Sequence, residues 1–504
     1  MKYLEPIDNL LNRFTMYRLL VYVLSIYAVL GVGFAFAGRL SATPTELVMS
    51  LAAILIAAYV TDRGLGRFFH VPTNMESSLI TSLILFLILN PADSVSSVLI
   101  LALAGAISSA SKFLIAWNGK HIFNPAAFAA ATLSLTGLGV TSWWIGNSWF
   151  WPVTALLGLA IVYKIRRLPL LITFSVVAVL LQAFLFMHAG RDVGDAMKNA
   201  LFSSPIIFLS SIMLTEPATM PPRRLQQMFF GALVAVLYVT SWEFGPLVIY
   251  PEVALLIGNL FAYAVSPKYR VRLKLKETRR VSDRVYDYVF QPDRPFKFLP
   301  GQYMEWTLPR IPYDSRGNRR TFTIASSPTE QDVHLGIKYY EPASMYKASL
   351  MEMKPGDMVY ASQIAGNFTL KGNEGKKLAF IAGGIGITPF RSMVKYLTDT
   401  QKMSDIVLLY VVSDPHEFAY AQQLRDAAAV GVKTIPIVTD LAYQAPGVVT
   451  AKLDANTLSQ LVPDFTERTF YVSGPNVMVD GTKHYLYQLG VLPTRIRTDH
   501  FSGY

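Results

Sequence analysis

The segment from Gly383 to Pro389, Gly-Gly-Ile-Gly-Ile-Thr-Pro, is a glycine-rich turn of the kind that binds phosphate groups. It follows the apolar run 377–382, which is typical of a buried strand, and its proline suits the first turn of a helix. At a strand-turn-helix junction, backbone N–H groups and the helix dipole attract a pyrophosphate. A glycine turn alone is weak evidence for a nucleotide, so the neighbouring elements must support it. The residues expected to bind a pyrophosphate are Gly383, Gly384, Gly386 and Thr388.

A second group of chemically useful side chains, Arg320-Thr321-Phe322-Thr323, lies earlier in the chain. A guanidinium forms a forked pair with phosphate, an aromatic ring offers a stacking face and a hydroxyl offers a hydrogen bond. The four residues match an Arg-x-(Tyr/Phe)-(Ser/Thr) signature, and about residues 270–504 resemble the ferredoxin-NADP reductase superfamily. The resemblance implies that Arg320 binds flavin phosphate, that Phe322 faces the isoalloxazine and that Thr323 reaches flavin N5. After a flavin domain, the glycine turn indicates a nicotinamide site.

The segment from Ser344 to Asp357 corresponds to the part of these relatives that binds flavin diphosphate. Lys347 stands where relatives have a Ser or Thr. Because a lysine also binds phosphate, as a point charge, we expect FAD rather than FMN, with Ser344 and Lys347 as contacts.

Two later segments resemble the segments that surround the nicotinamide and the flavin in the ferredoxin-NADP reductase superfamily. Ser473-Gly474-Pro475 stands where relatives commonly have Cys-Gly, so hydride alignment has to proceed without a thiol. The terminal segment 499–504 resembles the aromatic segment that covers the flavin, with Phe501 as the first choice for that contact. The resemblance implies catalytic contacts from Thr323, Ser473 and Phe501, and cofactor contacts from Gly474, Pro475 and Tyr504.

The choice between NADH and NADPH depends on the end of the second strand of the nucleotide fold, Val-Val-Ser-Asp-Pro-His-Glu-Phe at 411–418. Asp414 would repel a 2′-phosphate, and no arginine follows closely. We therefore expect NADH to be preferred.

Charge is distributed unevenly between the two halves of the chain. Residues 1–265 hold 15 Lys and Arg and 11 Asp and Glu, of 45 and 34 in all 504 residues. Such a low charge density is typical of a membrane domain. The net charge of +11 contains no dense basic block, which argues against nucleic-acid binding. The absence of Cys excludes disulfides, Cys-ligated iron-sulfur clusters and Cys-attached haem in this chain.

Apolar runs recur about every 25 residues in the first half, which predicts about ten membrane spans. If the N-terminus is inside, twelve Lys and Arg fall on the cytoplasmic side and three on the other. Both termini are then cytoplasmic in a multi-pass protein of the cell membrane. The N-terminal residues lack a cleavage site, so a removable signal peptide is not expected.

The first half also matches itself at an offset of 126 residues. Pro91 falls on Pro217, Pro125 on Pro251 and Gly105 on Gly231. Five spans per copy, an odd number, would place the copies upside down to one another, as in transporters with inverted repeats. Such folds have a midplane site beside broken helices, and polar residues within lipid are functional candidates. The candidates for this site are Asn90, Asn124, Glu216 and Glu252.

Residues 119–129, Gly-Lys-His-Ile-Phe-Asn-Pro-Ala-Ala-Phe-Ala, and the string Thr-Glu-Pro-Ala-Thr at 215–219 resemble membrane proteins of two redox complexes. These are the D-type membrane proteins of Rnf complexes and the B-type membrane proteins of sodium-pumping NADH:quinone reductase. Such relatives carry covalent flavin on a Ser-Gly-Ala-Thr motif, which this chain lacks, so covalent FMN is not expected. A noncovalent flavin in this half is compatible with the resemblance.

We therefore expect a polytopic α-helical membrane domain built as an inverted repeat (1–265), an antiparallel β-barrel FAD domain (266–372) and an α/β nucleotide-binding domain (373–504). The expected function is oxidation of cytoplasmic NAD(P)H through FAD, with electrons passing to or through the membrane domain to a quinone, a flavin or a partner redox protein. One alternative is a transporter or channel regulated by redox state. Another is a haem-containing ferric reductase, but the histidines of the first half, His70, His121 and His188, are unpaired near span ends, so haem is not expected.

Overall fold

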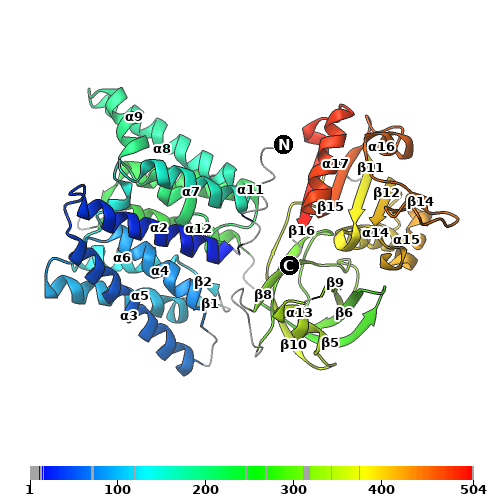
Figure 1. Cartoon of the computed structure of the whole chain (residues 1–504), viewed down its shortest axis with the longest axis horizontal. Helices are drawn as coiled ribbons and strands as arrows, with labels where there is room; N and C mark the ends of the chain where they lie inside the picture. Colours follow the sequence, from blue (N-terminus) through cyan, green and yellow to red (C-terminus); the bar gives the residue numbers. More distant parts are fainter. Residues whose placement is uncertain are drawn as a thin grey trace. The chain divides into compact units, whose positions relative to one another are not determined.

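The computed structural model describes residues 11, 14, 16–69, 73–117, 120–244, 247–266, 270–309, 318–341, 343–373 and 375–501. The chain divides into two compact units, Met1–Lys268 and Tyr269–Tyr504, which are described separately (Figure 1).

The first unit is a bundle of helices with two short hairpins. Its longer helices in chain order are α2 (Met16–Phe36), α3 (Pro44–Phe68), α4 (Met75–Ile88), α5 (Val95–Leu114), α6 (Pro125–Thr136), α7 (Trp151–Lys164), α8 (Leu168–His188), α9 (Val193–Phe202), α11 (Arg224–Thr240) and α12 (Pro251–Val265). The bent segment α10 (Ile206–Phe208) continues into η2 (Leu209–Met213). The hairpins are β1–β2 (Ala116–Trp117 and Lys120–His121) and β3–β4 (Glu243–Phe244 and Leu247–Val248).

These elements recur in the order that the 126-residue offset predicts. In each copy a helix is followed by a two-stranded hairpin and then by a helix that begins with proline, Pro125 in α6 and Pro251 in α12. The packing recurs as well, because α3 packs on α5 as α8 packs on α11. The duplication is therefore visible in the elements and in their neighbours, while the inverted orientation of the copies stays a prediction.

Each of the ten expected apolar segments contains a helix, but the helices differ in length. Within the described ranges, α2, α3, α5 and α8 are long and apolar enough to cross a membrane, and α9 with α10–η2 forms a bent fifth candidate. The remaining apolar helices α4, α6, α7, α11 and α12 have 14, 12, 14, 17 and 15 residues, short of the roughly 20 that a full span needs. A proline lies in the first turn of α6, α7 and α12, and ten full-length spans are not confirmed.

The second unit begins with a curled, six-stranded antiparallel sheet in the order β8-β7-β10-β5-β6-β9. Its strands are β5 (Val271–Arg280), β6 (Val285–Pro292), β7 (Tyr303–Thr307), β8 (Arg319–Thr323), β9 (Val333–Lys338) and β10 (Met358–Ala365). The short helix α13 (Met345–Met351) lies between β9 and β10 in the chain. Trp306 and Phe290 pack in the core of this sheet.

A parallel sheet in the order β14-β13-β12-β11-β15-β16 completes the second unit. Its strands are β11 (Lys377–Gly383), β12 (Asp405–Val412), β13 (Val432–Val438), β14 (Val449–Thr450), β15 (Thr469–Pro475) and β16 (Ile496–Phe501). The helices are α14 (Thr388–Asp399), α15 (Ala421–Asp426), α16 (Ala455–Leu461) and α17 (Asn476–Gln488). The strand order reverses between β11 and β15, and ligands of such folds bind beyond the carboxyl ends of strands at this switch point.

Candidate functional site

The strand β8 brings the three predicted flavin contacts to one edge of the antiparallel sheet. The side chain of Thr323 is buried, while those of Arg320 and Phe322 are partly exposed. Both of these partly exposed side chains approach Tyr346 of α13. The Arg320 guanidinium lies 5.1 Å from the centroid of the Tyr346 ring, and the centroids of the Phe322 and Tyr346 rings are 5.8 Å apart. Tyr346, which the sequence analysis missed, therefore brings β8 and the expected diphosphate segment together.

The two residues predicted on that segment are placed differently. Ser344 caps α13, because its hydroxyl accepts a hydrogen bond from the backbone N–H of Lys347 at 3.4 Å. The ammonium of Lys347 donates to the backbone oxygen of Lys338 at 2.8 Å. Lys347 thus joins α13 to the end of β9.

The glycine turn lies at the switch point between β11 and β15, where the backbone leaves no space for side chains. It consists of Gly383 and the 3-10 turn η3 (Gly384–Ile387), followed by α14. A Cβ on Gly386 would lie 2.3 Å from the backbone oxygen of Ser473, and one on Gly383 would lie 2.1 Å from Sδ of Met478. The sequence folds this way because only glycine permits this approach.

The end of β15 supplies the other predicted nicotinamide contacts. Ser473 is fully buried, and its Oγ has no hydrogen-bond partner within the described ranges. Pro475 lies opposite Phe501 in the pairing of β15 with β16, which places the predicted aromatic beside this end of the strand. Tyr504 lies outside the described residues. The unsatisfied hydroxyl of Ser473 and the crowded glycines therefore meet at one point of the sheet.

Three further residues surround this point. Asp414 follows β12 and caps a 3-10 turn, accepting a hydrogen bond from the backbone N–H of His416 at 2.9 Å. The hydroxyl of Thr388 donates to the backbone oxygen of Ile385 at 3.1 Å, so it closes the glycine turn. A Cβ on Gly384 would lie 3.9 Å from Nζ of Lys338, a cation that sequence reasoning missed. Lys338 is buried and forms an ion pair with Glu417 at 2.6 Å.

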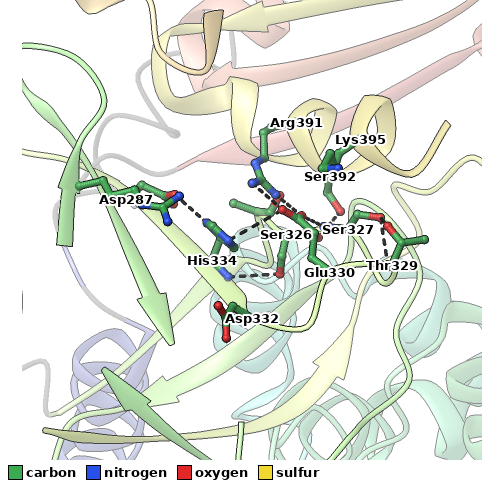
Figure 2. A network of polar contacts seen from close by, with 12 residues as sticks. Asp287, Ser326, Ser327, Thr329, Glu330, Asp332, His334, Arg391, Ser392 and Lys395 are labelled. Carbon is green, nitrogen blue, oxygen red and sulfur yellow. Dashed lines mark hydrogen bonds and ion pairs between the residues drawn. The ribbon is translucent and has the colours of Figure 1, made fainter. Parts of the chain in front are cut away.

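A buried polar network connects the antiparallel sheet to α14 (Figure 2). The guanidinium of Arg391 donates through NH1 to the backbone oxygen of Ala325 at 3.0 Å and through NH2 to Glu330 at 2.9 Å, and NH1 also contacts the second oxygen of Glu330. His334 hydrogen-bonds Asp287 through Nδ1 at 2.7 Å. Because an ionised carboxylate can only accept, Nδ1 carries the proton.

The pKa shifts within this network indicate which of its side chains are charged. Burial alone would raise the pKa of Asp287, but the hydrogen bond and charge of His334 and the charge of Arg391 outweigh it and hold this pKa below its ordinary value. Burial disfavours the charged form of Arg391, but the hydrogen bonds and charge of Glu330 raise its pKa. Burial and the charge of Asp287 raise the pKa of Tyr420, whose hydroxyl donates to Asp287 at 3.1 Å. Asp287 is thus an anion and Arg391 a cation.

Sequence reasoning did not identify this network. Its members come from β6, β9, the β8–β9 connection and α14, which are separated by up to about 100 residues. The only local signal was the string Thr-Pro-Phe-Arg-Ser after the glycine turn, which places a charged residue in the first turn of a helix that is otherwise buried at 388–394.

The four membrane-site candidates lie in different surroundings. Glu216 accepts a hydrogen bond from Thr219 at 2.8 Å and contacts His121 Nε2 at 3.1 Å. Asn124 caps α6, and its backbone N–H donates to the side-chain oxygen of Asn259 at 2.9 Å. Glu216 and Asn124 line a common cavity of about 40 Å³. This volume is smaller than the roughly 300 Å³ of pockets for organic cofactors.

Glu252 and Asn90 lie apart from that cavity. Glu252 is fully buried and accepts hydrogen bonds from Ser134, Thr141 and Trp143 at 2.9, 3.1 and 3.2 Å. Asn90 is exposed. Pro217 lines the cavity and Pro91 does not, and a midplane site formed by both breaks stays a prediction.

Comparison with known proteins agrees with the geometry of the second unit. Residues 380–484 match the family model of the oxidoreductase NAD-binding domain. The glycine betaine monooxygenase reductase subunit of Pseudomonas aeruginosa is 26% identical over 223 residues, which cover 43% of this chain and 60% of that protein. An NADH oxidoreductase of Escherichia coli K12 is 25% identical over 173 residues, which cover 34% and 51%. The chain thus spans less than two thirds of the length of these relatives.

Among solved structures, the FAD/NAD-binding domain of a Vibrio cholerae nitric oxide dioxygenase is similar at 21% identity and a TM-score of 0.41, covering 46% of this chain and 98% of that one. The expectation of an NAD(P)H-dependent flavin oxidoreductase agrees with this family model and with these relatives, a monooxygenase reductase subunit and an NADH oxidoreductase. The resemblance of the first unit to the membrane proteins of Rnf complexes and sodium-pumping reductases stays a prediction.

Proposed function

We propose that this chain is a membrane-bound flavoprotein that oxidises NADH through FAD and passes the electrons to an acceptor at or beyond the membrane. The observation that carries the proposal is the arrangement of the second unit, in which the flavin strand β8 and the glycine turn at the β11/β15 switch point are joined by the buried network of Arg391 and Glu330.

The residues of the second unit fit FAD and a nicotinamide nucleotide. Arg320 would hold the flavin diphosphate with help from Lys347, and Phe322 would pack against the flavin ring. Gly383 and Gly386 lie too close to Met478 and Ser473 to carry a Cβ, so the turn is tight, and the backbone N–H groups of such a strand-turn-helix junction attract a pyrophosphate. The buried, unsatisfied hydroxyl of Ser473 is the kind of orphaned polar group that a bound nicotinamide would satisfy.

FAD supplies a carrier that accepts a hydride from C4 of NADH at N5 and releases electrons singly or in pairs. The contribution of the chain is therefore binding, orientation and exclusion of water. Thr323 would hydrogen-bond near N5, Ser473 would orient the nicotinamide, and Phe501 would cover the flavin until the nicotinamide arrives. Asp414 would hydrogen-bond the adenosine ribose.

The membrane assignment rests on the surface of the first unit. Large apolar side chains are exposed along its long helices, among them Val29 of α2 (71%), Ile56 of α3 (64%) and Leu180 of α8 (64%). Such a surface is unfavourable in water and suits lipid. With the N-terminus inside, the lysines and arginines collect on the cytoplasmic side, which would place the second unit in the cytoplasm. The acceptor belongs to the class of quinones or partner redox proteins.

The absorption spectrum of the purified full-length protein in detergent tests this proposal. We expect flavin bands that NADH bleaches without oxygen, and complete release of the flavin by acid because the chain lacks a Ser-Gly-Ala-Thr motif. A Soret band would favour the haem-containing reductase instead, and a protein without flavin would refute the proposal.

A second candidate function, a redox-regulated transporter, is favoured by the repeated elements of the first unit and by the small cavity that Glu216 and Asn124 line. Solute flux into proteoliposomes that does not depend on NADH would support it over electron transfer.

Asp414→Arg should shift nucleotide preference toward NADPH, because it replaces a charge that repels the 2′-phosphate with one that attracts it. We expect the ratio of kcat/KM for NADPH to that for NADH to rise by roughly tenfold to a hundredfold, as for one new charged contact. Asp426→Arg, at the far end of α15, provides a control with the same change of charge and should leave the ratio unchanged. An equal ratio in both variants would place Asp414 away from the ribose.

A further inference from the structure

The connection between β8 and β9 is tied to α14 by a set of contacts that we call the latch. On the connection it comprises Ala325, Ser326, Thr329 and Glu330, and on the helix it comprises Arg391, Ser392 and Asp399. Ser392 donates to the backbone oxygen of Ser326 at 2.6 Å, and Thr329 donates to Asp399 at 2.5 Å. In Figure 2 the helix side chains point toward the connection from one face of the helix.

One side of the latch is continuous with the flavin strand. Ala325 is two residues after Thr323, and its backbone N–H donates to the backbone oxygen of His334 at 3.0 Å. Ile324 between them donates to the backbone oxygen of Gln302 at 2.9 Å. Because these bonds fix the connection to its own sheet, a displacement of the oxygen of Ala325 would also displace Thr323.

The other side of the latch is continuous with the glycine turn. Arg391 lies in the first turn of α14, five residues after Gly386. Thr388 bonds back to Ile385, so the turn and the start of the helix move as one piece. The guanidinium of Arg391 is 2% exposed, and its hydrogen bonds run to the flavin side of the latch, to Ala325 and Glu330.

Close packing supports the same alignment next to the latch. A Cβ on Gly336 of β9 would lie 2.5 Å from the hydroxyl of Tyr420 and 2.7 Å from Cγ2 of Thr388. A Cβ on Gly301, whose φ is +90°, would lie 2.5 Å from Cε of Met393. These glycines let the antiparallel sheet and the helix α14 approach each other. Apolar contact alone would still let the two surfaces slide past one another. A forked guanidinium fixes both the direction and the distance between its partners.

We propose that Arg391 is a positioning residue that sets the separation between the flavin strand and the nicotinamide turn, and thereby the rate of hydride transfer. This inference rests on the proposed function. In that step the C4–H bond of NADH breaks and its electron pair and hydrogen form a bond to flavin N5, giving NAD⁺ and reduced flavin with no further reactant. Displacement by about 1 Å at such a step costs roughly a hundredfold in rate.

The test compares Arg391→Lys with Arg468→Lys in the full-length protein. Arg468 is also a buried arginine of the parallel sheet, with Asp464 at 2.6 Å, Asp405 at 2.8 Å and the backbone oxygen of Leu378 at 2.9 Å as partners. These partners lie at the amino ends of the strands, opposite the glycine turn. Lysine keeps the charge at either position but cannot form the fork, so both variants lose a comparable buried interaction.

Stopped-flow measurement of flavin reduction by NADH separates positioning from stability. For Arg391→Lys we expect at least a tenfold lower limiting rate of reduction, a dissociation constant for NADH within threefold of that of the unaltered protein, and a weaker nicotinamide–flavin charge-transfer absorbance. For Arg468→Lys we expect a rate within twofold and an unchanged charge-transfer absorbance, although its melting temperature falls. Glu330→Gln, which removes the charge of the partner but keeps its shape, should lower the limiting rate at least threefold.

The outcomes distinguish the two proposals. If the unaltered protein binds no flavin or is not reduced by NADH, the proposed function fails. If it is reduced and Arg391→Lys matches it in rate and charge-transfer absorbance, or Arg468→Lys is slowed equally, the positioning role of Arg391 is refuted. If Arg391→Lys does not fold, Glu330→Gln decides, and a rate equal to that of the unaltered protein refutes the role.

Discussion

Arg320→Ala protein is expected to purify with less than roughly a tenth of the flavin that the unaltered protein carries. Arg320 is partly exposed, and its guanidinium lies 5.1 Å from the Tyr346 ring centroid, beside the segment expected to bind the diphosphate. Hydrogen bonds to charged groups contribute about 1.5–3 kcal/mol, so loss of a forked pair should weaken FAD binding by roughly tenfold to a hundredfold. The ratio of absorbance at 450 nm to that at 280 nm, followed by titration with FAD, measures the loss.

The neighbouring residue provides the control for this variant. Arg319 precedes Arg320 on β8, so its side chain points to the opposite face, where it pairs with Glu305 at 3.5 Å. Arg319→Ala removes the same charge from the same strand and should retain the flavin content of the unaltered protein. Equal loss in both variants would mean that net charge rather than a specific phosphate contact holds the flavin. Full flavin content in Arg320→Ala would refute the assignment of this residue.

The elements around the glycine turn could be predicted because their signals are local. An apolar strand, a turn that only glycine can form and a proline at the helix start all fall within 13 residues, 377–389, and each has a separate physical reason. The structure places Gly383 and Gly386 against the end of β15, where the sequence analysis had also placed Ser473. The proximity of Ser473 to the glycine turn depends on the order of the strands in the sheet. A resemblance to a known family supplies that order, whereas the periodicity of apolar residues does not.

The network of Asp287, Glu330, His334 and Arg391 could not be predicted in the same way. The contact between Glu330 and His334 spans four positions, but Asp287 lies 47 positions from His334, and Glu330 lies 61 positions from Arg391. No spacing rule relates a residue in β6 to one in β9 or α14. The sequence marks each of these residues only as a charge on an otherwise buried element. Their pairing depends on how two sheets are packed, which is a tertiary property.

In the first half, hydropathy located the helices but overestimated their length. All ten expected segments contain helices, yet α4 ends at Ile88 before Asn90-Pro91, and α6 begins only at Pro125. Hydropathy averaged over a window of residues does not show that a proline can end the helix before it and start the helix after it. The 126-residue offset also places Asn90 and Glu216 at equivalent positions, one residue before each matched proline, whereas Glu216 lines the cavity and Asn90 does not.

Asp287→Asn is expected to destabilise the second unit by about 3 kcal/mol at neutral pH, as for a buried charged pair that loses one partner. Asp287 is nearly inaccessible and accepts hydrogen bonds from His334 and Tyr420. Its pKa in the folded protein is held below the ordinary value of 3.8 by the hydrogen bond of His334 and the charges of His334 and Arg391, against the opposing effect of burial. A depressed carboxyl pKa stabilises the fold above pH 3.8 and loses that contribution as the pH falls through the folded value.

Hydrogen exchange measured by mass spectrometry can follow this effect in the peptides of β6 and β9 of the full-length protein, where local stability is read without assuming two-state unfolding. Asp332→Asn is the matched control, because Asp332 forms a surface ion pair with Lys276 at 2.9 Å, and such pairs contribute at most about 1 kcal/mol. Comparison of both variants at each pH cancels the intrinsic dependence of exchange on pH. At pH 7 the Asp287→Asn peptides should exchange roughly a hundredfold faster than those of the control, and the difference should shrink below pH 3.8 as Asp287 itself becomes protonated in the control. If the difference in exchange rate between the two variants stays constant down to the lowest pH measured, the stability lost in Asp287→Asn comes from the shape of the side chain rather than from its charge.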